Sequence, residues 1–277
     1  MAARGFVSYW ILPVFSSLVW LGMLLGLLLY WVVDTNSVHY SYMDANDSIA
    51  FISDVGASNL KPLFIAGSSV TTVFLDLSFA AERLLRHNGR LVPNTTVKEK
   101  VLSILSIIFA IVGTAGLILL SIFDTNHHHK AHDIFLLLFI AGYIISAIFI
   151  CWEYQQLGLY NRQHRVLRIS FWVKLTFVLV EFVLAVVFVA TNWSDNQNVA
   201  AVFEWIIAFI FTFYILSFVI DLLPAIRTKP HSARFPKLHE HDIESTNSHD
   251  GINAQQMAQT GTYQNDYDRG VTRYDFR

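Results

Sequence analysis

Six long apolar segments, separated by short polar segments, dominate the sequence. They span residues 10–33, 63–85, 101–123, 134–152, 169–191 and 199–223. A helix needs about 20 apolar residues to cross the hydrocarbon core of a bilayer. Lipid offers no hydrogen-bond partner to backbone groups, so each segment is expected to be a helix, whereas a β-barrel would show short segments of alternating polarity. The pattern predicts an all-α, polytopic membrane protein whose residues 1–223 form a six-transmembrane-helix bundle.

Residues 224–277 differ in composition from the rest of the chain. After Pro224 the sequence is polar, His-rich and acidic, and few large apolar residues follow Phe235. Such a segment cannot bury enough apolar surface to fold by itself. It is expected to be a disordered cytosolic tail.

Composition supports the membrane assignment and narrows the chemistry. Of the 277 residues, 54% are hydrophobic and only 14% are charged, which is unusual for a water-soluble domain. The single cysteine, Cys151, excludes an intramolecular disulfide. The first apolar segment is too long for a cleavable signal peptide and is expected to be a retained anchor. The sequence contains no P-loop, GxGxxG, GxSxG or HExxH motif, so it predicts no cofactor and favours a protein that is not an enzyme.

Basic residues predict the orientation, because cytosolic loops of membrane proteins are enriched in Lys and Arg. With both termini in the cytosol, the outer loops contain only Lys61 and Lys130. The inner segments would contain the remaining basic clusters: Arg4; Arg83, Arg86, Arg90, Lys98 and Lys100; Arg162, Arg165 and Arg168; Arg227, Lys229, Arg234 and Lys237. The sequon at Asn46 then lies in the first outer loop and is a glycosylation candidate.

The first outer loop, residues 34–61, contains the unusually apolar segment FISDVGA. One interpretation is a short interfacial helix with Ser53 or Asp54 as its cap. The other is that the loop folds over the bundle and brings Asp54 near Asp124 and His132. This cluster could be a head-group site or a structural network. Zinc binding and acid–base chemistry are further alternatives, although three consecutive histidines, residues 127–129, cannot all point the same way.

Ionisable residues inside membrane spans are candidate functional residues, and here they are Asp76, Lys174 and Glu181. Their depths, counted at about 1.5 Å per residue, would allow an Asp76–Lys174 ion pair. Lys174 could instead extend to the interface. Glu181 lies near mid-membrane, where an ionised side chain costs about 2.5–3.5 kcal/mol. A structural role and a lipid, ion or proton site both remain open.

Arginines flank the second and fifth spans at helical spacing. Arg86, Arg90, Arg162 and Arg165 are candidate contacts for anionic lipid head groups, which suit these positions better than nucleic acid does. The alternative is that these charges only set the topology.

Several segments resemble one family that unites the damage-regulated autophagy modulators (DRAM), the FGF-receptor-activating proteins and the fungal suppressor-of-four-kinase proteins, with a CWH-type N-terminal domain. The similarity covers residues 9–229 and is greatest to the fungal branch. The segments that carry it are FISDVGA, LKPLFIAGSS, AERLLRHNGRLVPN, GLILLSIFDTNHHHKAHDIF, CWEYQQLGLYNRQHRVLRISFWVK and FTFYILSFVIDLLPAIRTK.

The resemblance implies a six-spanning, non-enzymatic regulator of lipid organisation or signalling, because the family is associated with phosphoinositide 4-kinase recruitment, phospholipid asymmetry and autophagy. Its partners would be membrane lipids, including anionic phosphoinositides, and a cytosolic kinase complex or adaptor. The plasma membrane is the expected location, with an endomembrane or the vacuole or lysosome as alternatives. A second function is remodelling of GPI-anchor lipids, or another lipid-modifying reaction, at Asp54, Asp124 and His132. A third is lipid or ion transport through Asp76, Lys174 and Glu181.

Overall fold

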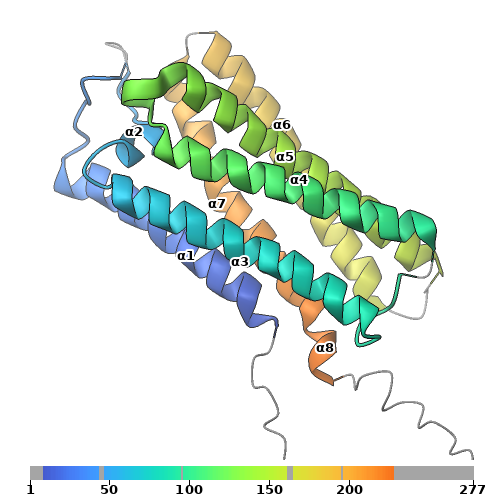
Figure 1. The fold of residues 1–277 in the computed structure, drawn as a ribbon. Coiled ribbons are helices and arrows are strands. Elements are labelled where there is room, and N and C mark those ends of the chain that lie inside the picture. The colour runs from blue at the N-terminus through green and yellow to red at the C-terminus, as the bar shows by residue number, and fades with distance from the viewer. Residues whose placement is uncertain (1–8, 44–46, 95, 161–164, 195, 228–277) are drawn as a thin grey trace, which may run out of the picture. The chain divides into compact units, whose positions relative to one another are not determined.

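A computed structural model describes residues 9–43, 47–94, 96–160, 165–194 and 196–227, and it is helical, with no strand in these ranges. Six long helices correspond to the six apolar segments, which confirms the all-α, six-span prediction. They are α1 (Ile11–Leu29), continued by the π-helical turn η1 (Tyr30–Asp34), α3 (Lys61–His87), α4 (Val97–Ile122), α5 (Thr125–Tyr160), α6 (Arg165–Trp193) and α7 (Gln197–Leu222). Two short helices, α2 (Ile52–Gly56) and α8 (Pro224–Arg227), lie outside the spans (Figure 1). The predicted tail after Arg227 lies outside the described residues.

Successive long helices run in opposite directions along one bundle (Figure 1). We call one end of this bundle the α2 end: α1, α4 and α6 finish there, and α3, α5 and α7 begin there. The opposite end is called the α8 end. This alternation places the residues 35–43 and 47–60 and the start of α5 at the same end of the bundle.

Glycines allow α4 and α5 to approach each other closely. A Cβ atom added at Gly142 would lie 2.6 Å from the backbone nitrogen of Gly113, and one at Gly116 would lie 2.5 Å from the backbone nitrogen of Phe139. Small residues at such crossings allow helix backbones to pack directly in lipid. This contact fixes the wall from which α5 presents Phe139 and Tyr143 to the bundle interior.

Candidate functional site

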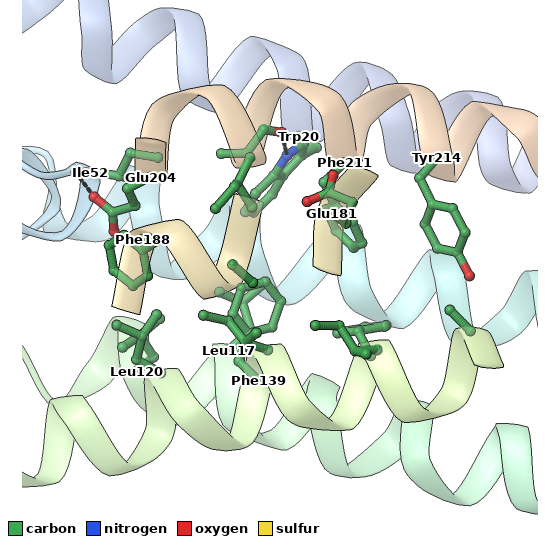
Figure 2. Close-up of a pocket in the computed structure, with 18 of the residues that line it drawn as sticks. Trp20, Ile52, Leu117, Leu120, Phe139, Glu181, Phe188, Glu204, Phe211 and Tyr214 are labelled. Atoms are coloured by element: carbon green, nitrogen blue, oxygen red, sulfur yellow. Dashed lines mark hydrogen bonds between the residues drawn. The ribbon is translucent and has the colours of Figure 1, made fainter. Parts of the chain in front are cut away.

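An apolar cavity of about 110 Å³ lies inside the bundle, lined by residues of all six long helices and of α2. It follows the helix direction from Glu204 and Ile52 at the α2 end to Tyr214, with Glu181 between them (Figure 2). Aromatic and aliphatic side chains form most of its wall, including Trp20, Leu117, Leu120, Phe139, Phe188 and Phe211. Among the described lining residues, the carboxylates of Glu181 and Glu204 are the only acidic groups, and none is Lys, Arg or His.

One face of α6 presents Glu181 to this cavity. Val178, Glu181, Ala185 and Phe188 all line it, at spacings of three and four residues that place side chains on the same helix face. The Oε1 atom of Glu181 is buried, and it has no hydrogen-bond partner among the described residues. A buried polar atom without a partner is costly. Glu181 is therefore the group in the cavity wall best placed to bind a ligand.

Ile52 lines the α2 end of the cavity, and three side chains of α7 hold the segment 48–52 in place. Ile52 N–H donates to Glu204 Oε2 at 2.7 Å, a contact drawn in Figure 2, and Trp205 Nε1 donates to the Ala50 carbonyl at 3.0 Å. The Oδ1 atom of Asn198 accepts from the backbone nitrogens of residues 48 and 49, at 2.7 and 2.8 Å. These contacts explain why FISDVGA is apolar, because the segment packs onto the bundle instead of facing solvent.

Asp54 caps helix α2 and also contacts the start of α5. Its Oδ2 accepts from Phe51 N–H at 3.0 Å, and its Oδ1 accepts from the Thr125 hydroxyl at 3.3 Å. The Tyr42 hydroxyl donates to the Asp54 carbonyl at 2.7 Å. Burial raises the pKa of Asp54 to about 6. The segment FISDVGA thus packs over one end of the bundle and also forms a short helix, whose N-cap residue is Phe51 rather than the predicted Ser53 or Asp54, with Asp54 contributing from the third helical position.

The other two residues of the predicted outer cluster have separate partners. Asp124 accepts from Lys61 Nζ at 2.5 Å and from His127 N–H at 2.8 Å. Burial opposes the shift, but hydrogen bonds from Lys61 and His127 lower the pKa of Asp124 to about 2. His132 is buried, and its Nδ1 lies 3.0 Å from the Phe123 carbonyl. The three residues therefore gather at one end of the bundle, but each is held by a different neighbour.

A metal centre is not formed in the part of the chain that the structure describes, where no group of three or more His, Cys, Asp or Glu could hold an ion. The histidines at 127–129 are exposed, and His129 Nδ1 lies 3.3 Å from Asp133 Oδ2 on the same helix. These contacts support helix α5 at its first turns rather than a site.

The suggested Asp76–Lys174 ion pair is wrong, because Lys174 pairs with Asp221. Lys174 Nζ contacts the Asp221 carboxylate and donates to Ser170 Oγ at 2.8 Å, whereas Asp76 Oδ2 accepts from the Thr114 hydroxyl at 2.8 Å. Side chains tilt toward the N-terminus of their helix. Lys174 on α6 therefore tilts toward the α8 end and away from Asp76. Asp221, the next-to-last residue of α7, tilts toward Lys174.

Arg86 does not reach the lipid surface, contrary to expectation. It is 4% exposed, its Nη2 lies 2.6 Å from Glu82 Oε1, and its Nη1 donates to the Val92 carbonyl at 3.0 Å. The Tyr154 hydroxyl also donates to Glu82 Oε1, at 2.5 Å. The i, i+4 spacing of Glu82 and Arg86 on α3 lets the two side chains neutralise each other inside the bundle.

The remaining candidates are only partly described. Arg90 Nη2 donates to the Ala225 carbonyl at 2.5 Å, which links the end of α3 to α8. Arg162, Asn46 and the side chain of Arg165 lie outside the described residues.

Sequence reasoning missed four acids near the α8 end: Glu82, which is partly buried beside Arg86, and the buried Glu99, Glu153 and Asp221. Glu153 is 5% exposed, and its Oε1 accepts from Asn94 Nδ2 at 2.7 Å. Glu99 and Glu153 lie just outside the predicted apolar segments, and Glu82 and Asp221 lie in the last turn of theirs, where a hydropathy criterion counts them as interfacial. The signal that could have found Asp221 is Lys174 itself, since a lysine within a span requires an acid on a neighbouring helix.

Comparisons with known proteins agree with this architecture. Residues 8–225 match the family described as Frag1/DRAM/Sfk1/Cwh43P N-terminal domain. Protein sfk1 of Schizosaccharomyces pombe is 30% identical over 214 residues, covering 77% of this chain and 63% of the relative. Protein SFK1 of Saccharomyces cerevisiae is 27% identical over 177 residues, covering 53% of this chain and 49% of the relative. The chain thus spans less than two thirds of either relative, and no solved structure matches it.

Proposed function

This chain belongs to the Frag1/DRAM/Sfk1 family of integral membrane proteins, and we propose that it is a non-enzymatic regulator of membrane lipid organisation that acts by binding a membrane lipid in its cavity. The observation that carries the proposal is the cavity of about 110 Å³ with its apolar wall. Apolar cavities of roughly this size, about 150 Å³ in a studied case, stay dry and bind small apolar molecules such as benzene, so the part of a lipid that enters would be a ring or a short hydrocarbon segment. Inside a bilayer, lipid hydrocarbon is the apolar molecule at hand.

The proposed regulator has its α8 end in the cytosol and resides in the plasma membrane. The orientation is supported by the basic residues of the segments at this end, including Arg83, Arg90 and Arg168. With Arg86 buried, contact with phosphoinositides falls to Arg90, Arg162 and Arg165, at about 1 kcal/mol for each charge near the surface. A lipid-dependent change in the bundle would then be passed to a cytosolic kinase complex or adaptor at this face.

The geometry gives less support to the two other functions. A lipid-modifying reaction at the α2 end would need an available acid or base, but Asp124 is engaged by Lys61 and His132 lies against the Phe123 carbonyl. Transport through the bundle would need a connected polar path. Asp76, Lys174 and Glu181 instead lie in three separate environments.

Photo-crosslinking tests the proposal directly. The full-length protein, reconstituted in phosphatidylcholine nanodiscs with a lipid that carries a photoreactive group in its hydrocarbon, is expected to be labelled on the cavity-facing sides of α5, α6 and α7. The cavity-filling substitutions Ala185→Phe and Ala208→Phe replace buried alanines of the wall and should abolish this labelling. Ala80→Phe, at an exposed position of α3, is the matched control and should leave labelling unchanged.

The outcome that would overturn the proposal is wild-type labelling of the cavity residues in both filled variants. Its regulatory half needs a cellular measurement. In a strain deleted for the protein, lipidomics and phosphoinositide imaging should show a defect that wild type restores and the correctly inserted Ala208→Phe variant does not. Full restoration by that variant would mean that regulation does not depend on lipid binding in the cavity, and the regulatory half of the proposal would fail.

A further inference from the structure

The carboxylate of Glu181 is unusual because it lies in the cavity wall at the depth of the membrane centre. The residue lies 16 positions after the start of α6 and 12 before its end, or about 24 Å and 18 Å along the helix. Both distances exceed half of a hydrocarbon core of about 30 Å. Glu181 therefore lies near mid-membrane, at a depth where the hydrogen bonds of interfacial water do not reach it.

The neighbouring elements supply no counter-charge to this carboxylate. Among the described residues, no ion pair involves Glu181, and the nearest cation on its own helix face, Lys174, is held by Asp221. Glu204, the other carboxylate of the wall, already accepts from Ile52 N–H. From α7 and α1 the cavity is faced by Phe211, Tyr214 and Trp20, and the Trp20 Nε1 donates to the Ala208 carbonyl at 2.8 Å.

This wall discriminates among lipid classes. A phospholipid head group carries a phosphate, which requires cations or several hydrogen-bond donors, and two carboxylates would repel it. A hydroxyl group fits instead, because it can donate to an ionised carboxylate and can also accept from a protonated one. A hydroxyl therefore satisfies Glu181 in either protonation state, and the aromatic wall suits the hydrocarbon that carries it.

We propose that the cavity selects a neutral, hydroxyl-bearing lipid without phosphate, whose hydroxyl group hydrogen-bonds to Glu181 while its hydrocarbon occupies the apolar wall beside Phe139 and Phe211. This inference rests on the proposed function, since it names the ligand class of the same cavity. Sterols and diacylglycerols share this chemistry, and the experiment distinguishes them.

The test compares photoreactive probes on the full-length protein in phosphatidylcholine nanodiscs: a sterol, a diacylglycerol and a phosphatidylcholine. Unlabelled sterol, diacylglycerol and sphingosine serve as competitors. Glu181→Leu removes the polar group, Glu181→Gln keeps a donor and an acceptor, and Thr176→Leu is the matched control, a polar-to-leucine change at an exposed position of the same helix. Size-exclusion profiles select correctly folded samples.

At least one hydroxyl probe should label wild type, Glu181→Gln and Thr176→Leu, and its apparent affinity should fall about tenfold in Glu181→Leu, which corresponds to one lost hydrogen bond to a charged group. The probe whose labelling falls in Glu181→Leu shows whether the bound lipid is a sterol or a diacylglycerol. Equal labelling of wild type and Glu181→Leu would overturn the inference, as would stronger competition by sphingosine or preferential labelling by phosphatidylcholine.

The filled variant separates the two proposals. If Ala208→Phe abolishes labelling while Glu181→Leu does not, the cavity binds lipid but does not select a hydroxyl group. If neither substitution affects labelling, both proposals fail.

Discussion

Breaking the Lys174–Asp221 pair should expose the strongest energetic coupling in the bundle. Both side chains are almost completely buried, at 1% and 2% exposure, and Lys174 Nζ also lies 4.3 Å from the Phe218 ring centre and 4.9 Å from that of Tyr154. Replacing either partner leaves a buried charge without its counter-ion. Lys174→Met and Asp221→Leu are therefore each expected to lower the free energy of unfolding by about 3–5 kcal/mol.

The double variant should behave very differently from the two single ones. If the substitutions acted independently, Lys174→Met with Asp221→Leu would lower the free energy of unfolding by about 6–10 kcal/mol. Because the double variant removes both charges together, we expect a stability near that of wild type, since apolar replacement of a buried ion pair is often neutral or stabilising by about 1–4 kcal/mol.

The measurement is reversible unfolding in mixed micelles, titrated with a denaturing detergent and followed by tryptophan fluorescence. A control double variant, Thr176→Leu with Val183→Leu, changes exposed positions on the same helix and should leave the midpoint unchanged. Additive losses in the Lys174 and Asp221 cycle would refute the reasoning, because they would mean that the two charges are stabilised by other groups.

Three further predictions concern the two ends of the bundle. Because burial raises the pKa of Asp54 from its ordinary 3.8 to about 6, the folded state binds its proton more tightly than the unfolded state. Stability from this group should therefore fall by about 2 kcal/mol as pH rises from 4 to 6, and Asp54→Asn should remove that dependence in pH-dependent unfolding curves. Arg86→Gln should lower the unfolding midpoint without changing binding to phosphoinositide vesicles. Joint neutralisation of Arg162 and Arg165, with Arg90 left in place because it also holds the Ala225 carbonyl, should weaken vesicle binding without a comparable loss of stability, and the reverse pattern would contradict the assignment of these arginines. Reporter fusions after Arg90 should report the cytosol and fusions in the loop that carries α2 the opposite side, and one fusion on the wrong side would overturn the orientation.

The helices could be predicted from sequence because lipid imposes one strong requirement, a long apolar stretch, on every span. The ends could not be predicted as well. Helix α5 runs from Thr125 to Tyr160, well beyond the predicted residues 134–152, because polar residues past the hydrocarbon can continue a helix. A non-helical residue, His128, within this extension marks the kink where the chain leaves the bundle axis.

Which charged side chains pair inside the bundle was harder to predict than how deep each of them lies in the membrane. Counting residues placed Lys174 and Asp76 at similar depths, but the direction in which each side chain tilts depends on the direction of its helix. Arg86 was misplaced for a different reason: its position suggested a surface charge, although Glu82 one turn earlier on the same helix could pair with it, and Tyr154 of α5 completes the contact through Glu82. Sequence also identified Glu181, but the cavity beside it requires all six long helices in place.

Glu181 differs from the two membrane-embedded cations in a way that links stability to function. Lys174 and Arg86 each have an acidic partner, whereas Glu181 Oε1 has no hydrogen-bond partner among the described residues. A charge at this depth costs about 2.5–3.5 kcal/mol, a large part of the net stability of about 5–15 kcal/mol typical of a folded protein. Glu181→Leu should therefore raise the unfolding midpoint of the ligand-free protein in mixed micelles while it weakens binding of the hydroxyl-bearing lipid, because residues that serve ligand binding are often not the most stabilising ones. A variant that lowers the midpoint instead would mean that Glu181 stabilises the bundle, and the cavity would then need another explanation for its carboxylate.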